Sequence, residues 1–299
     1  MMMPPGTSLL GGDDILEGLP PSTHRYQYEC EQQFLDVMFR EHDLWSRGET
    51  NEFVVFINLD ERTFHRGFLE SSEKLINNSW QSYSSLSQCL HARMKTGTHE
   101  ELHFAFYDLL REKLVPMGLG HSLHRQGGRT TSGGPKGKQA DNGLYPRRLP
   151  PGRTDKWPSV VIEVAFSESK TKLRCDLDWW LSQSNGDVKT AISLSTNKSK
   201  REIIIEAREM VEGSKGRAPA LQQQVVIRKQ TADSITSVTN APFTIAFESL
   251  LLRPTTQPAE GDLELTEDDL QKLAEEVWET QSFRDRTMEM GDHLSEDGM

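Results

Sequence analysis

Apolar residues recur every three or four positions in five segments, the spacing of helices that bury one face. The first is CEQQFLDVMFREHDLW (30–45), the second is the serine-rich NNSWQSYSSLSQCLHARM (77–94), and the third spans residues 98–114. KLRCDLDWWLSQSNG predicts a fourth helix, ending at Gly186, where glycine can adopt a left-handed cap. In the fifth, LTEDDLQKLAEEVW (265–278), we expect one apolar face to pack on the domain: Leu270, Leu273, Ala274, Val277 and Trp278.

Continuous apolar runs that are rich in β-branched residues lie between these helices and predict buried strands. They are EFVVFINL (52–59), VVIEVAF (160–166), DVKTAISLST (187–196) and REIIIEARE (201–209). VVIRKQ (225–230) and FTIAFESLLL (243–252) predict further strands or a closing helix. The order helix, strand, strand, helix, strand, strand predicts an α/β fold, in which a central mixed β-sheet is flanked by helices.

These elements divide the chain into four predicted segments. Residues 1–24 are rich in Pro and Gly and are predicted to be disordered, and residues 25–92 form a mostly helical N-terminal extension. Residues 93–253 form the α/β domain. Residues 254–299 form an acidic tail with one amphipathic helix.

Charge is distributed unevenly over these segments. Residues 1–90 hold 6 Lys/Arg against 14 Asp/Glu, residues 91–253 hold 25 against 17, and residues 254–299 hold 3 against 14. A basic segment between two acidic ones indicates that the middle of the chain binds a polyanion. We therefore expect nucleic acid as a partner, with DNA favoured over RNA. The acidic tail would then soften this binding or recruit a protein partner. The alternative is uneven surface charge on an ordinary domain.

Several kinds of protein are disfavoured by what the chain lacks. The start, MMMPPGTSLLGGDD, has neither the basic segment nor the apolar run of a signal peptide, and no stretch reaches the roughly 18 apolar residues of a membrane span. Three distant cysteines suggest neither a disulfide framework nor a cysteine zinc site. We therefore expect an intracellular protein, cytoplasmic or nuclear, with no membrane partner.

One short motif raises the possibility of a zinc protease. GTHEELH (97–103) contains H-E-x-x-H, in which His99 and His103 would share a zinc ion and Glu100 would act as base. Thr98 and Glu101, however, have the spacing of a capping box at a helix start, and no third ligand follows. The motif therefore favours an ordinary amphipathic helix with exposed histidines, or a helix whose Glu100 faces an active site built elsewhere.

Two acidic residues stand out further along the chain. Glu163 lies inside an apolar strand between Ile162 and Val164, where a charge is costly unless it is paired or bound to a cation. Asp141 follows the glycine-rich basic loop RQGGRTTSGGPKGK. If the strands that hold these acids pair, their carboxylates converge and offer oxygen ligands to Mg²⁺. Such an ion would activate water and neutralise charge on a phosphate under attack.

The arrangement of these residues resembles the PD-(D/E)XK nuclease superfamily over roughly residues 93–210. It is most similar to the restriction endonuclease-like domains, including a fungal branch. The resemblance rests on Asp141, on Glu163-Val164-Ala165 in a strand, and on a following helix with Trp179-Trp180 before SNGDVK and another strand. It implies a restriction endonuclease-like core, in which Asp141 and Glu163 bind Mg²⁺ or Mn²⁺. It also implies that a helical glutamate, here Glu100, assists catalysis.

The lysine of the superfamily motif is missing from its usual place. Ala165 stands two residues after Glu163, where the simplest family pattern has the lysine that orients the attacking water. Related families move this lysine onto the following helix, so Lys170 or Lys172 would replace it. Lys172 is the better candidate because it begins the helix and can point back toward Glu163. The alternative for both lysines is a solvated surface position.

Structural explanations also exist for the other candidates. Asp141 precedes Asn142-Gly143 and suits a turn, and Glu163 suits an edge strand if it pairs with Arg147 or Arg174. The tryptophan pair suits helix–sheet packing. The basic residues near the site suit either phosphate contacts or a solvated loop: Arg147, Arg148, Arg153 and Lys156.

The sequence thus favours a Mg²⁺-dependent nuclease or a degenerate descendant of one. The alternative is a non-catalytic domain that keeps the fold to bind nucleic acid or protein. A zinc protease is a remote third hypothesis.

Overall fold

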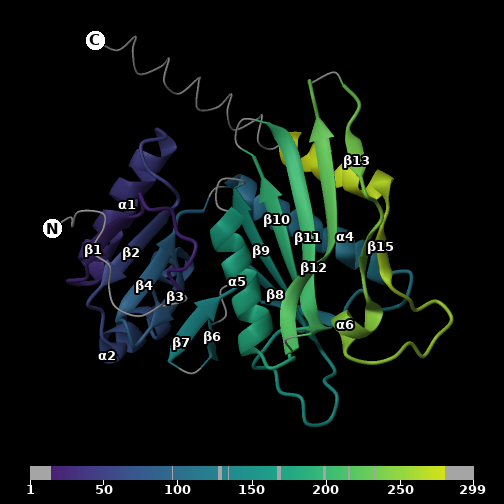
Figure 1. Cartoon of the computed structure of the whole chain (residues 1–299), viewed down its shortest axis with the longest axis horizontal. Coiled ribbons are helices and arrows are strands. Elements are labelled where there is room, and N and C mark those ends of the chain that lie inside the picture. Colours follow the sequence, from purple (N-terminus) through teal and green to yellow (C-terminus); the bar gives the residue numbers. More distant parts are fainter. Residues whose placement is uncertain are drawn as a thin grey trace.

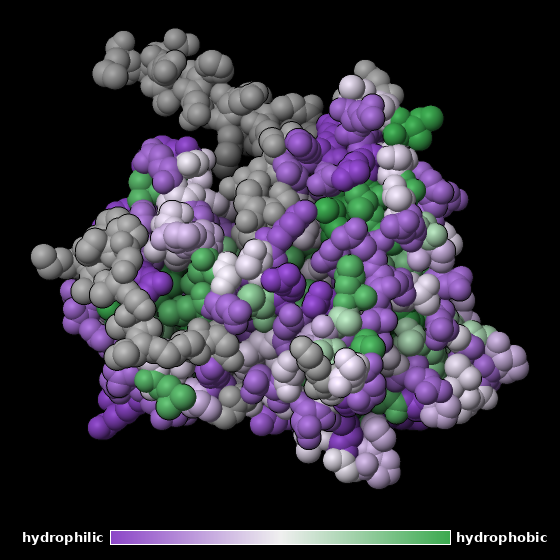
Figure 2. All heavy atoms as spheres, in the orientation of Figure 1, coloured by the Kyte–Doolittle hydropathy of each residue, from purple (hydrophilic) through white to green (hydrophobic). Residues whose placement is uncertain are grey.

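The computed structural model describes residues 15–95, 97–126, 130–133, 135–166, 170–197, 200–214, 216–231 and 234–279. Two β-sheets lie side by side, with helix α5 between them (Figure 1). The face seen in Figure 2 is largely hydrophilic, and its hydrophobic side chains form small separate patches. No helix in these ranges is long and apolar enough to cross a membrane.

The first sheet has six strands in the order β1-β2-β4-β3-β7-β6. They are β1 (His24–Gln27), β2 (Phe53–Ile57), β4 (Cys89–Arg93), β3 (Trp80–Ser84), β7 (Lys136–Gln139) and β6 (Thr130–Gly133). Its helices are α1 (Glu31–Ser46), α2 (Glu61–Phe64), the π-helix η1 (His65–Leu69) and α3 (Lys74–Ser79). Aromatic side chains from these helices and strands, including Phe34, Phe56, Phe68 and Trp80, form its core.

This sheet corrects the prediction of a mostly helical extension over 25–92. Strands β3 and β4 occupy the serine-rich segment that was predicted to be helical. Polar residues in both strands are buried, among them Gln81, His91 and Arg93, because they face the other half of the molecule. Polar positions that pack inside a protein disturb the apolar alternation by which a strand is usually identified. Strands β6 and β7, which come from the predicted α/β domain (93–253), complete the same sheet.

The second sheet has seven strands in the order β13-β12-β11-β10-β9-β8-β5. They are β13 (Ser237–Thr239), β12 (Gly216–Lys229), β11 (Arg201–Gly213), β10 (Thr190–Thr196), β9 (Val160–Phe166), β8 (Asn142–Pro146) and β5 (Leu123–Gln126). Strands β9 and β10 are parallel and are joined by α5 (Lys170–Gln183), while the other neighbours are antiparallel. The predicted α/β class, a mixed sheet flanked by helices, is confirmed.

Helices cover both faces of the second sheet. Leu102, Phe106 and Leu110 of α4 (Gly97–Leu114) share one core with Ile162 and Val164 of β9. On the opposite face, Leu177 and Trp180 of α5 pack with Val161 and Ala191. Alternate residues of β9 therefore point to opposite helices, as side chains along a strand must.

The C-terminal part packs on the α4 face through β14 (Phe243–Ile245), α6 (Phe247–Leu251), β15 (Leu263–Leu265) and a helix over 267–279. All five apolar residues that were predicted to form one helical face are buried in this core. That face is therefore part of the fold, and the predicted protein partner of the tail would have to use other residues. Residues 280–299 of the predicted tail lie outside the described residues.

The N-terminal prediction is corrected in part. Residues 1–14 of the predicted disordered segment lie outside the described residues, but Ile15 is buried. Gly18 has φ +79°, and a Cβ on it would lie 2.8 Å from the Cα of Lys172. The segment that begins at Ile15 therefore packs closely on the start of α5.

Shortening one apolar side chain of the C-terminal helix tests whether this helix belongs to the core. Leu270 is fully buried, so Leu270→Ala is expected to lower the free energy of unfolding by about 2–5 kcal/mol. Urea denaturation of the full chain measures this change. Lys272→Ala, at an exposed position of the same helix, is the control and is expected to change it by less than about 0.5 kcal/mol. Equal effects of the two substitutions would contradict the packing described.

Candidate functional site

The register of β8 against β9 brings the two predicted acids together. Asn142 pairs with Ile162, Gly143 with Val161 and Leu144 with Val160. Asp141 lies one residue before β8, close enough to Glu163 for its negative charge to raise the pKa of that carboxyl. The backbone N–H of Val164 donates to Oδ2 of Asp141 at 2.9 Å, which fixes the Asp141 side chain against β9. The predicted pairing of the two segments is confirmed, while the roles of both acids stay predictions.

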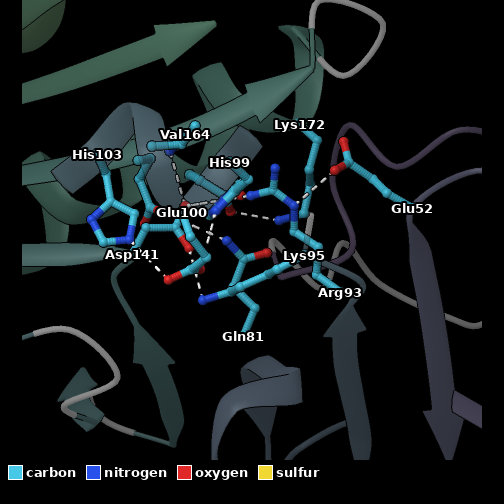
Figure 3. A network of polar contacts seen from close by, with 12 residues as sticks. Glu52, Gln81, Arg93, Lys95, His99, Glu100, His103, Asp141, Val164 and Lys172 are labelled. Atoms are coloured by element: carbon cyan, nitrogen blue, oxygen red, sulfur yellow. Dashed lines mark hydrogen bonds and ion pairs between the residues drawn. The ribbon is translucent and has the colours of Figure 1, made fainter. Parts of the chain in front are cut away.

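Asp141 is buried among cationic partners, which come from β4, from the segment that follows it and from α4 (Figure 3). Lys95 Nζ lies 3.1 Å from Oδ1, His99 Nε2 lies 3.2 Å from Oδ2, and Arg93 Nη1 lies 3.5 Å from Oδ2. Burial opposes ionisation, but the charges of His99, Lys95 and Arg93 hold the pKa of Asp141 well below its usual range. Asp141 is therefore ionised at neutral pH.

Arg93 links this cluster to the first sheet. Its Nε donates to Oε2 of Glu52 at 3.0 Å, and both side chains are buried (Figure 3). Its Nη2 is buried without a hydrogen-bond partner among the described residues. A buried guanidinium with an unused donor is costly unless a further acceptor satisfies it.

Glu163 has a different environment from Asp141, although it is equally buried. Trp180 Nε1 donates to Oε1 at 2.6 Å, and Gln81 Nε2 lies 3.5 Å from Oε2. Burial and the negative charge of Asp141 raise the pKa of Glu163 to about 8, although Lys138 opposes the rise. In the described part of the chain no ion pair joins Glu163 to Arg147 or Arg174, which removes the pairing considered from the sequence.

Lys172 points into the interior from the first turn of α5 and is almost completely buried. Its Nζ lies 2.5 Å from Oδ1 of Asp176, and Lys138 forms a second ion pair with the same carboxylate. Burial opposes ionisation of Asp176, but the two lysines hold its pKa at about 2. Lys172 is thus not a solvated surface residue. Its nearest carboxylate is Asp176, and its predicted role in orienting water stays a prediction.

Glu100 lies between the two histidines of the H-E-x-x-H motif. Its carboxylate is 3.4 Å from His99 Nδ1 and 3.1 Å from His103 Nε2. Hydrogen bonds from His103 and His99 hold the pKa of Glu100 below its usual range. The prediction of exposed histidines is wrong, since both are buried. The sequence did not show that this turn of α4 faces the first half of the chain.

The two histidines of the H-E-x-x-H motif each contact a carboxylate, and the zinc hypothesis stays a prediction. His99 and His103 are each held by a carboxylate, Asp141 and Glu100 respectively. No group of three or more His, Cys, Asp or Glu side chains suited to a metal occurs in the ranges that the structure describes. Glu100 and Asp141 line the same pocket, and the alternative that Glu100 faces an active site built elsewhere stays a prediction.

This pocket has a volume of about 700 Å³ and lies between α1 and α3 on one side and α4 on the other. Lys95, with a side chain 27% exposed, connects the Asp141 carboxylate to the pocket. The remaining lining residues are Leu35, Met38, Phe39, His42, Leu75, Asn78, Ser79, Arg93, Met94, Glu100, His103, Phe104, Arg125, Gln139, Asp141 and Asn142. Asp141 is thus the member of the acid pair that a ligand reaches first.

Other sequence candidates have structural roles, and several site residues were missed. Arg153 bonds to Asp187 and to the carbonyl of Trp157, so it supports a loop. Trp180 packs as predicted but also donates to Glu163. Sequence reasoning missed seven residues of the site: Glu52, Gln81, Arg93, Lys95, His99 as a partner of Asp141, Lys138 and Asp176. Of these seven residues, Asp176 alone had a signal in the sequence. It lies four positions after Lys172 on a predicted helix, a spacing at which side chains contact each other.

Comparisons with known proteins give little. No family model matches the chain, and no curated protein matches it. Among solved structures, it is similar to an Anabaena variabilis protein described as a "putative nuclease belonging to DUF820". The identity is 12%, the TM-score is 0.37, and the match covers 65% of this chain and 90% of that one. Likeness at this level carries no argument about activity.

Replacing Glu163 tests whether it holds a proton in the native state. Between the ordinary value of 4.5 and about 8, the folded chain keeps a proton that the unfolded chain loses, so stability falls as pH rises. Glu163→Gln removes this loss. Without divalent cations, the variant should unfold with a free energy close to that of wild type at pH 5, and about 1–3 kcal/mol higher at pH 8. Urea denaturation at both pH values measures the difference.

Glu112→Gln, at an exposed position on α4, is the matched control and should show no such change with pH. A Glu163→Gln effect that is the same at pH 5 and pH 8 would mean that Glu163 is ionised throughout this range.

Proposed function

We propose that the chain is a Mg²⁺- or Mn²⁺-dependent nuclease of the PD-(D/E)XK type. It hydrolyses the phosphodiester bonds of nucleic acid, and DNA is favoured over RNA as its substrate. The observation that carries the proposal is the closeness of two buried acids on neighbouring segments. Among the residues that the structure describes, Asp141 has cations within ion-pair distance and Glu163 has none. The resemblance of the sequence motif supports the same assignment of Asp141 and Glu163.

The chemistry of the donors fits a hard divalent cation. Both acids supply oxygen ligands, which Mg²⁺ prefers, and Mg²⁺ commonly uses only one or two carboxylates together with water and substrate oxygens. Glu163 accepts hydrogen bonds from neutral groups, and burial and the negative charge of Asp141 raise its pKa. A cation at this position would favour the ionised carboxylate. It would supply an activated water and neutralise charge on the phosphate.

We assign separate roles to the two acids and to the residues around them. Asp141 and Glu163 hold the cation, and Trp180 and Gln81 orient the Glu163 carboxylate. Lys95 and Arg93 present positive charge at the pocket floor, where phosphate oxygens would accept hydrogen bonds. Because Ala165 replaces the usual lysine and Lys172 is held by Asp176, Lys95 is the better candidate for orienting the attacking water. Glu100 supports His99 and His103 at the edge of the site.

Cleavage of labelled DNA and RNA in Mg²⁺ or Mn²⁺ tests this proposal. Asp141→Asn and Glu163→Gln are each expected to lower the cleavage rate by about 100-fold or more, because each removes charge that holds the cation. Glu112→Gln, prepared in the same way, should cleave like wild type. Retention of activity by both acid variants would overturn the assignment.

Lys95→Met separates the two lysine candidates. It should lower kcat by about 10- to 100-fold while the chain stays folded, because the partly exposed side chain makes few packing contacts. Lys172→Met is expected to act mainly by destabilising the chain, since it leaves Lys138 as the remaining ion-pair partner of a buried Asp176. A larger effect of Lys172→Met on kcat, at equal stability, would favour the original assignment.

A second function is favoured by one observation, the three cationic partners that already surround Asp141. Together with Ala165, they suit a non-catalytic domain that keeps the fold to bind nucleic acid. In that case Asp141→Asn would leave DNA affinity unchanged in Mg²⁺ and in EDTA alike. Wild-type protein would then show no cleavage with either metal.

A further inference from the structure

The mouth of the pocket combines exposed apolar side chains from three helices. Phe39 of α1 is 61% exposed, Leu75 of α3 is 51% exposed and Phe104 of α4 is 37% exposed. All three line the pocket that leads to Asp141. Scattered apolar residues on a surface need no explanation, but several around one concave opening mark a binding site.

Positive charge lies directly beside this apolar mouth. The guanidinium of Arg125 lies 4.5 Å from the ring centroid of Phe104 and 4.9 Å from that of Tyr107. Lys95 and Arg93 lie deeper, on the carboxylate of Asp141. The pocket therefore offers flat surfaces, from an aromatic ring and a guanidinium, together with cations that suit an anionic group.

The floor of the pocket holds buried polar atoms that have no partner. Arg93 Nη2 and both side-chain amide atoms of Asn142 lack hydrogen-bond partners among the described residues, although both side chains are buried. Native interiors rarely leave such groups unsatisfied unless water or a ligand completes them. Together they offer two donors and one acceptor beneath an apolar mouth.

We propose that this pocket takes one unpaired nucleotide from a single-stranded segment or strand end. The base lies between the apolar wall of Phe39 and Leu75 and the Phe104–Arg125 pair, and its phosphate contacts Lys95. Bases stack on aromatic and guanidinium planes whatever their sequence, which suits the apolar mouth of this pocket. The assignment rests on the proposed function, whose substrate it narrows to unpaired nucleic acid.

The depth of the acids supports the choice of an unpaired strand. Asp141 is only 5% exposed, and it is reached through a pocket of about 700 Å³. A volume of this size suits a ligand of nucleotide dimensions. An intact duplex holds its bases in the stack, and enzymes that act inside such pockets use single strands or nucleotides that leave the helix.

Binding in EDTA tests this proposal without any cleavage. Fluorescence anisotropy would compare the full chain with a labelled single-stranded oligodeoxythymidine and with a blunt duplex of equal length. Wild type should bind the single strand more tightly. Phe39→Ala should weaken single-strand binding by about 10-fold and leave duplex binding unchanged, and Phe39→Trp should restore it. Thermal unfolding should stay unchanged, because Phe39 is largely exposed.

Leu86→Ala is the matched control, since Leu86 is 78% exposed but does not line the pocket. Unchanged single-strand affinity of Phe39→Ala would overturn the proposal, and so would an equal loss for single strand and duplex. These outcomes are independent of the nuclease assignment. If Phe39→Ala binds like wild type while Asp141→Asn is inactive in cleavage, the pocket proposal fails and the proposed function stands.

Discussion

The antiparallel register of β8 against β9 is the constraint on which the site depends. It brings Asp141, one residue before β8, close to Glu163, and the hydrogen bond from Val164 N–H holds Asp141 in that place. A shift of one residue would turn every side chain of β8 to the opposite face and separate the two acids. The large cores on both faces of β9 make such a shift costly, so the hydrophobic packing also fixes the polar site.

The two acids differ because different parts of the chain surround them. The first sheet and the segment after it supply Arg93 and Lys95, so Asp141 is ionised. Glu163 faces the neutral side chains of Trp180 and Gln81, and burial and the negative charge of Asp141 raise its pKa. Unequal pKa values in a neighbouring pair are typical of functional sites, although structural networks produce them too. Here Glu163 has the higher pKa of the two acids, and a bound cation would favour its ionised form.

The apolar pattern of a segment predicted those elements that are fixed by the burial of that same segment. The apolar spacing of the C-terminal helix led to a correct placement because burial of one face leaves a periodic trace, and the continuous apolar run VVIEVAF correctly placed Glu163 in a buried strand. The cations beside Asp141 lie more than 40 positions earlier in the chain, and no periodicity links residues over that distance. The strands β3 and β4 escaped detection for a related reason: their buried polar side chains contact the second half of the molecule, which the local sequence does not show.

Calorimetric titration of the chain with Mg²⁺ at pH 7 and pH 9, in buffers of different ionisation enthalpy, tests the acid pair most directly. With the pKa of Glu163 at about 8, binding at pH 7 should release close to one proton per ion. At pH 9 it should release almost none, because Glu163 is already ionised. Absence of binding, or binding at pH 7 without proton release, would contradict a cation held between Asp141 and Glu163.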